Sequence, residues 1–185
     1  MSQLGTRPDV AALLEIANRP GAKRAVDVSL EEARGMLHAS RNLFDAPVGT
    51  LAVLRDITGG PCPMRLYDAR SERGPSPVIV FYHGGGFVLG DLDTHEPLCA
   101  EIARLTDLPV VSVDYALAPE HPFPAGVEQS IAAARWVAEG PRELGQVVTG
   151  LVLAGDSAGG NFTIVAAQAL RDAPAAVPVD RKSVV

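Results

Sequence analysis

The chain has 185 residues, of which 47% are hydrophobic, 5% aromatic and 21% charged, and this length predicts one sizeable core. Its formal net charge of -6 is spread along the sequence without blocks of like charge, which argues against binding to nucleic acid or to an anionic membrane surface. No apolar run approaches the roughly 20 residues of a membrane span and no basic leader opens the sequence, so the expectation is a cytoplasmic protein without a membrane span.

The first part of the chain predicts two helices. Apolar residues recur at helical spacing over residues 10–17 and stop at Pro20-Gly21. The second helix begins at a capping box, in which Ser29 precedes Glu32 by three positions. Together they form an expected N-terminal segment, residues 1–48.

The rest of the chain predicts a sheet with helices. Residues 51–57 and 64–67 form an expected antiparallel hairpin. Solid apolar runs then alternate with helix-like stretches, as strands buried on both faces do. The expected strands are residues 78–82, 110–113 and 151–154, and the expected helices are residues 96–105, 127–138 and 158–170. This alternation predicts an α/β fold with a doubly wound, mostly parallel sheet.

Two cysteines, Cys62 and Cys99, have neither metal-ligand nor redox spacing. They are interpreted as small buried hydrophobic residues rather than as a disulfide.

The sequence Gly155-Asp156-Ser157-Ala158-Gly159 lies between an expected strand and an expected helix. This position is typical of a nucleophile elbow, in which a serine occupies a tight, strained turn and its neighbours two before and two after must be small. The amide of Ala158, at the positive end of the helix, is expected to face the same space as the Ser157 hydroxyl. The alternative is a glycine-rich strand-to-helix turn with an incidental serine.

A second motif, His83-Gly84-Gly85-Gly86-Phe87, directly follows the strand expected at residues 78–82. It is the oxyanion-loop type of lipases and esterases, in which glycines let backbone amides face a developing oxyanion and keep side chains out of the substrate's space. The alternatives are a flexible glycine turn or a phosphate-cradling loop, although no Lys-Ser/Thr ending and no G-x-G-x-x-G occurs. His83 is interpreted as structural, because the base of such a site follows its nucleophile in the chain.

With these motifs the chain resembles the bacterial hormone-sensitive lipase family of carboxylesterases. The resemblance extends to about Pro178, and its matching segments occur in the right order: the two N-terminal helices, Arg65-Leu66-Tyr67, residues 83–87, Gly90-Asp91, His95, Val113-Asp114-Tyr115, residues 117–125 and residues 155–161. One departure is Ala116, where the family usually has arginine.

The resemblance implies an α/β-hydrolase fold with a Ser-Asp-His triad, a small-molecule ester substrate, no metal and no cofactor. It also implies a cap built partly from the N-terminal helices. The residues carried over by position are Ser157 as the nucleophile, the amides of Gly84, Gly85 and Ala158 as the oxyanion hole, Phe87 and Val88 as pocket walls, and His95 and His121 as loop-fixing residues.

The sequence after Ser157 contains Asp172 and Asp180 but no histidine. In the family the acid and the base follow later strands, so later strands and helices are expected to be missing and the chain is expected to be a poor catalyst. The outer edge of the strand at residues 151–154 is expected to be bare. Codons for residues 180–185 can be chosen so that they spell a common sequencing-library adapter. These six residues are therefore interpreted as a non-native tail. Residues 49–179 are the expected partial core.

Three functions follow as hypotheses. The first is a serine carboxylesterase that works through an acyl-enzyme. The second is a non-catalytic small-molecule receptor on the same fold, since plant gibberellin receptors resemble this family while lacking a working base. The third is a scaffold without a ligand. The sequence carries no signal for acyl length, alcohol preference or oligomeric state.

Overall fold

A computed structural model describes residues 6–181, and the chain divides into two compact units after Met36. The first unit contains helix α1 (Pro8–Ala17), the short 3-10 helix η1 (Ala25–Asp27) and the start of helix α2 (Leu30–Phe44). The backbone N–H of Glu32 donates to Oγ of Ser29 at 3.2 Å, as the capping box predicts. Both expected helices are therefore present.

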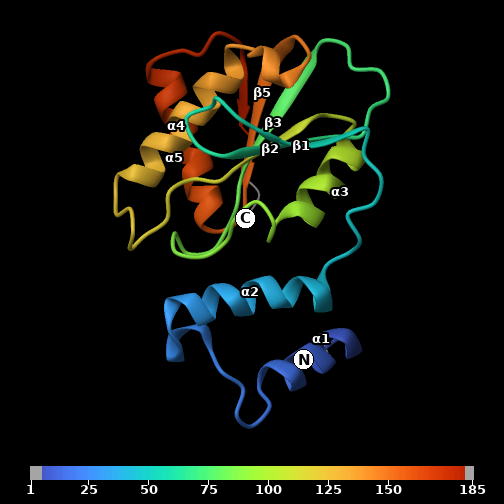
Figure 1. Cartoon of the computed structure of the whole chain (residues 1–185), viewed down its shortest axis with the longest axis vertical. Helices are drawn as coiled ribbons and strands as arrows, with labels where there is room; N and C mark the ends of the chain where they lie inside the picture. Colours follow the sequence, from blue (N-terminus) through green and yellow to red (C-terminus); the bar gives the residue numbers. More distant parts are fainter. Residues whose placement is uncertain (1–5, 182–185) are drawn as a thin grey trace, which may run out of the picture. The chain divides into compact units, whose positions relative to one another are not determined.

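The second unit is built on a six-stranded sheet with helices on both faces (Figure 1). Its strands are β1 (Val53–Ile57), β2 (Met64–Asp68), β3 (Ser76–Tyr82), β4 (Val110–Val113), β5 (Val148–Gly155) and β6 (Val179–Arg181), in the spatial order β1-β2-β4-β3-β5-β6. The pairs β1–β2 and β2–β4 are antiparallel, and the other pairs are parallel. The predicted mostly parallel sheet with an antiparallel N-terminal hairpin is confirmed.

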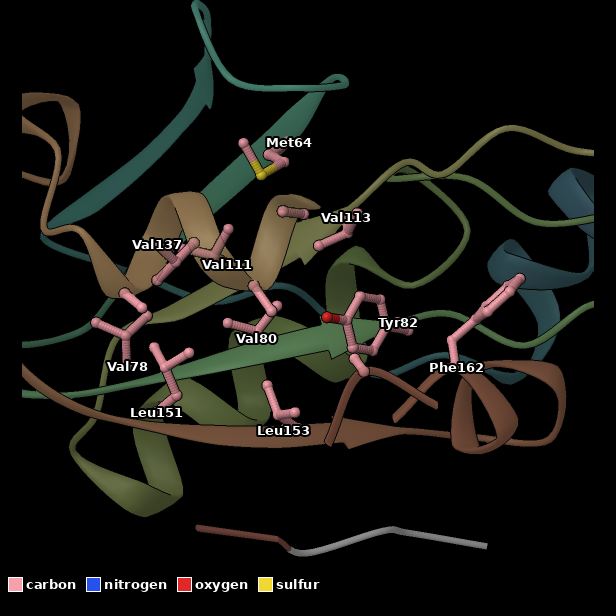
Figure 2. Packing of buried hydrophobic residues seen from close by; sticks show 14 of the residues in the cluster. Met64, Val78, Val80, Tyr82, Val111, Val113, Val137, Leu151, Leu153 and Phe162 are labelled. Carbon is pink, nitrogen blue, oxygen red and sulfur yellow. The ribbon is translucent and has the colours of Figure 1, made fainter. Parts of the chain in front are cut away.

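Three helices cover this sheet. Helix α3 (Glu96–Thr106) lies on one face, and helices α4 (Ala125–Ala138) and α5 (Ala158–Asp172) lie on the other, with the short 3-10 helix η2 (Arg142–Leu144) before β5 (Figure 1). Alternate side chains of β3 enter two cores. Val80 and Tyr82 pack in the α4–α5 core (Figure 2). Phe81 packs in the α3 core. Because both faces of β3 are buried over residues 78–82, its sequence is apolar throughout that stretch.

The outer edge of β5 is covered, and the prediction of a bare edge is wrong. After α5 the chain turns back, and residues 179–181 pair in parallel with residues 151–153. The N–H of Leu151 also donates to the carbonyl of Pro178 at 2.8 Å. The strand was missed because it is three residues long and because main-chain pairing tolerates many side chains. Residues 182–185 of the predicted tail lie outside the described residues.

A buried carboxylate connects β2 to the loops at its end. Asp68 has no exposed surface, and it accepts hydrogen bonds from Nε of Arg70 at 2.9 Å and from Nε of Arg73 at 2.8 Å. Arg73 donates in turn to the carbonyl of Leu144, and Arg70 donates to Oγ of Ser76 at 2.8 Å. This network therefore ties the end of β2 to the start of β3 and to η2. Both cysteines are buried and free, as predicted.

Candidate active site

Ser157 lies at the turn between β5 and α5, where it is exposed to solvent. Its backbone angles, φ 50° and ψ -116°, fall in a region that non-glycine residues rarely occupy, and such strain costs of order 1–3 kcal/mol. A Cβ on Gly155 would lie 2.6 Å from the carbonyl carbon of Gly159, and a Cβ on Gly159 would lie 1.8 Å from the carbonyl oxygen of Tyr82. Both positions therefore need glycine, as the elbow interpretation predicts.

The glycine loop lies beside this turn. Strands β3 and β5 are parallel neighbours, and Tyr82 is paired with Gly155. Since the carboxyl ends of parallel strands meet at the same edge of a sheet, the loop after β3 and the elbow after β5 emerge together. The N–H of Gly84 donates directly to Oδ1 of Asp156 at 2.8 Å. The two sequence motifs are thus in contact.

The buried His83 holds the start of this loop. Its ring stacks on Tyr115 at a centroid distance of 4.3 Å, and the Tyr115 hydroxyl donates to the His83 carbonyl at 2.5 Å. Burial lowers the pKa of His83 to about 4, so its imidazole is neutral near pH 7. Nδ1 of His83 lies 2.8 Å from the Gly84 carbonyl, to which it donates its proton. This geometry agrees with the structural role predicted for His83.

Three backbone N–H groups at this point have no acceptor within residues 6–181: those of Gly85, Gly86 and Ala158. Gly84 differs, because its N–H is engaged by Asp156. The prediction that the Gly84 amide faces an oxyanion is corrected by this bond, whereas Gly85 and Ala158 keep open donors.

The first two loop glycines are required by packing rather than by the space for a substrate. A Cβ on Gly84 would lie 2.0 Å from Oδ2 of Asp156, and one on Gly85 would lie 2.0 Å from the carbonyl oxygen of Leu89. Only Gly86 faces open space, at φ 62°. The prediction that glycine keeps side chains out of the substrate's path therefore fits Gly86 alone.

An apolar pocket of about 550 Å³ opens within one helical turn of Ser157. Asn161, four residues further along α5 and hence on the same helix face, is among its lining residues. Aromatic rings form much of the wall: Phe87 and Phe162 meet edge-to-face at 5.3 Å, and Phe123 also lines the pocket. Phe87 was predicted as a wall residue. Phe162 and Phe123 were missed, although Phe123 stands inside the matching segment 117–125 and Phe162 directly follows the segment 155–161.

Val88, the other predicted wall residue, is not among the residues that line this pocket. Its N–H donates to the carbonyl of Gly85 at 3.2 Å, so it forms part of the turn that closes the glycine loop.

The histidines of the described residues contact groups other than Ser157. Nε2 of His95 lies 3.5 Å from Oδ1 of Asp156, and Nε2 of His38 lies 2.6 Å from Oδ2 of Asp91. His121 is exposed and lines the apolar pocket. Within residues 6–181 no hydrogen bond joins the Ser157 hydroxyl to a histidine.

Within the described part of the chain, no group of three or more His, Cys, Asp or Glu side chains could hold a metal ion. None of the described helices has the length and apolar character needed to cross a bilayer.

Asp114, just after β4, is half-buried, and this burial, together with nearby Asp91 and Asp93, raises its pKa from 3.8 to about 6. The folded protein therefore holds this proton more tightly than the unfolded chain, and stability is lost as the pH rises from about 4 to about 6. We expect Asp114→Asn to raise the melting temperature at pH 7 and to flatten its pH dependence in that window. Thermal unfolding across pH 4–7, with exposed Asp45→Asn as the control, measures this, and a lower melting temperature at pH 7 would contradict it.

Comparison with known proteins identifies the family. A family model described as alpha/beta hydrolase fold matches residues 79–180, more than half of the chain, including both motifs. The chain belongs to this alpha/beta hydrolase family. Among its relatives, Esterase LipI of Mycobacterium tuberculosis is 41% identical over 166 residues, which cover 86% of this chain and 51% of LipI. Carboxylesterase NlhH of the same species is 53% identical over 110 residues, covering 60% of this chain and 34% of NlhH.

Solved structures agree with this alpha/beta hydrolase assignment. An esterase of Pyrobaculum calidifontis superposes with a TM-score of 0.79 at 36% identity, over 92% of this chain and 55% of that chain. The predicted resemblance to bacterial carboxylesterases of the hormone-sensitive lipase type is confirmed. The chain spans about half the length of LipI and about a third of NlhH.

Proposed function

We propose that this protein is a carboxylic ester hydrolase that uses Ser157 as its nucleophile and passes through an acyl-enzyme. The observation that carries this proposal is the contact between the elbow and the glycine loop. Ser157 is an exposed serine on a strained bend, and this contact brings open backbone donors next to it. The relatives named as esterases support the same reaction class.

In the proposed reaction the Ser157 hydroxyl attacks the carbonyl carbon of the ester, and the carbonyl oxygen gains negative charge. The N–H groups of Gly85 and Ala158 donate to that oxygen, with Gly86 as a third donor. A single donor of this kind is worth about 3–4 kcal/mol in the transition state. The alcohol leaves with a proton, and water then hydrolyses the acyl ester and restores the hydroxyl.

The apolar pocket suits one side of the ester. Apart from His121 and Asn161, its walls are aromatic, aliphatic or glycine, so a hydrocarbon group is stabilised there by burial and a charged group is disfavoured. We therefore propose small-molecule esters with an apolar acyl or alcohol group as substrates.

Activation of Ser157 needs an imidazole neighbour. None of the histidines in residues 6–181 is hydrogen-bonded to Ser157, and the sequence has no histidine after His121. We propose that residues 1–185 by themselves acylate Ser157 slowly, at a small fraction of a complete site's rate, because a serine hydroxyl without an imidazole neighbour is a weak nucleophile.

The test is release of p-nitrophenol from p-nitrophenyl esters of graded acyl length. We expect slow but measurable release from the unaltered chain and from Ser71→Ala, which changes an exposed serine far from the elbow in sequence. We expect none above background from Ser157→Ala. Equal release by all three would contradict the assignment of Ser157, and ester binding without acylation would favour the receptor.

A further inference from the structure

We propose that Asp156 is the positioning residue of the oxyanion loop, holding the Gly84 N–H with its carboxylate so that the Gly85 N–H is presented to the substrate. This inference rests on the proposed role of Ser157. The motif G-x-S-x-G leaves the position of Asp156 unspecified, so the role follows from contacts rather than from the pattern.

The carboxylate of Asp156 and the backbone of Gly84 fit each other closely. Oδ1 accepts the Gly84 N–H at 2.8 Å. A Cβ at Gly84 would lie 2.0 Å from Oδ2 and 2.9 Å from Cγ, so the carboxyl group occupies the place where a side chain would stand. Glycine at position 84 is therefore what admits the carboxylate, and the carboxylate fixes the amide.

The peptide that follows Gly84 is held by a second contact. The carbonyl of Gly84 accepts a hydrogen bond from the buried Nδ1 of His83 at 2.8 Å. The Gly84 carbonyl and the Gly85 N–H belong to one planar trans peptide, in which they point in opposite directions. With the carbonyl turned towards buried His83, the Gly85 N–H points away from it, and no described residue accepts that N–H.

The carboxylate of Asp156 has two partners at the site, the Gly84 N–H and His95. An uncompensated carboxylate close to a developing oxyanion would repel it. Burial acts to raise the pKa of Asp156, but His95 and the Gly84 N–H outweigh that effect, and the pKa lies below its usual range. Nε2 of His95 lies 3.5 Å from Oδ1, on the same oxygen that accepts the amide. The carboxylate thus stays ionised, as a strong acceptor requires, and two groups contact the same oxygen.

A spectroscopic experiment tests the anchoring without any need for catalysis. The amide proton of Gly84 is followed by NMR in the unaltered chain, in Asp156→Asn and Asp156→Ala, and in Asp172→Asn as a control for charge removal on α5. We expect the Gly84 resonance to move upfield in Asp156→Ala, by less in Asp156→Asn, whose amide oxygen can still accept, and not at all in Asp172→Asn. An unchanged resonance in Asp156→Ala would overturn the proposal.

A kinetic experiment tests the consequence for the oxyanion site. Diethyl p-nitrophenyl phosphate is used to phosphorylate Ser157 in a single turnover. The rate is measured over a range of reagent concentrations, which gives the maximal rate and the half-saturation concentration as two separate quantities. We expect the maximal rate to fall at least about 10-fold in Asp156→Ala and less in Asp156→Asn, with half-saturation little changed, because the lost interaction is made in the transition state. Melting temperatures identify any variant that is unfolded.

The two experiments separate the inference from the function on which it rests. If the unaltered chain is not phosphorylated at Ser157, the proposed function fails, and the Gly84 resonance still decides the anchoring. If Ser157 is phosphorylated at the same rate in folded Asp156→Ala as in the unaltered chain, the positioning role of Asp156 is overturned while the proposed function stands.

Discussion

Gly159→Ala is expected to destabilise the second unit by roughly 3 kcal/mol or more, or to prevent it from folding. The added Cβ would lie 1.8 Å from the carbonyl oxygen of Tyr82 and 2.8 Å from that of His83. Both contacts are with backbone at the end of the central strand β3, so no side-chain rotation relieves them. Urea unfolding measures the loss.

The matched control for this substitution is Gly74→Ala. Gly74 lies in the loop before β3, and an added Cβ there meets nothing within 4 Å. We expect a change within about 1 kcal/mol, or a small gain from the stiffer unfolded chain. If Gly159→Ala unfolds at the same urea concentration as Gly74→Ala, the tight elbow described for Ser157 does not exist in solution.

Asp68→Ala is expected to cost about 3–5 kcal/mol, the range typical of removing one partner of a buried ion pair. The substitution leaves two arginines with little exposure, Arg70 and Arg73, without their shared carboxylate. Asp68→Asn keeps the shape and part of the hydrogen bonding and is expected to cost less.

Asp56→Ala provides the contrast, because Asp56 pairs with Arg65 at 2.6 Å on the surface, with its own side chain 63% exposed. Exposed pairs of this kind contribute about 0–1 kcal/mol. Chemical denaturation of the three variants therefore separates a buried ion pair from an exposed one. Equal losses for Asp68→Ala and Asp56→Ala would show that burial does not set the strength of the Asp68 network.

Much of this architecture could be predicted from local sequence rules. Strand β3 was predictable because burial on both faces demands a continuous apolar run, and the hairpin of β1 and β2 because turn residues separate two β-prone segments. The elbow was predictable for a stricter reason. Gly155 and Gly159 approach each other and Tyr82 so closely that the sequence has no freedom at those positions.

Other features depend on contacts between distant residues and left no local signal. Strand β6 is held by main-chain pairing with β5, and the types of its side chains do not indicate this pairing. The engagement of Gly84 by Asp156 joins residues 72 positions apart, so a resemblance by position predicted an open Gly84 amide where the structure has one bonded to Asp156. Phe162 lines the pocket beside Phe87, a residue 75 positions away in the sequence that it meets edge-to-face.

The most direct test of Ser157 as the nucleophile is a crystal structure of the chain after phosphorylation with diethyl p-nitrophenyl phosphate. We expect a covalent adduct on Oγ of Ser157 whose phosphoryl oxygen accepts hydrogen bonds from the N–H groups of Gly85 and Ala158, while Gly84 stays bound to Asp156. An adduct on another residue, or a phosphoryl oxygen turned away from both amides, would contradict it.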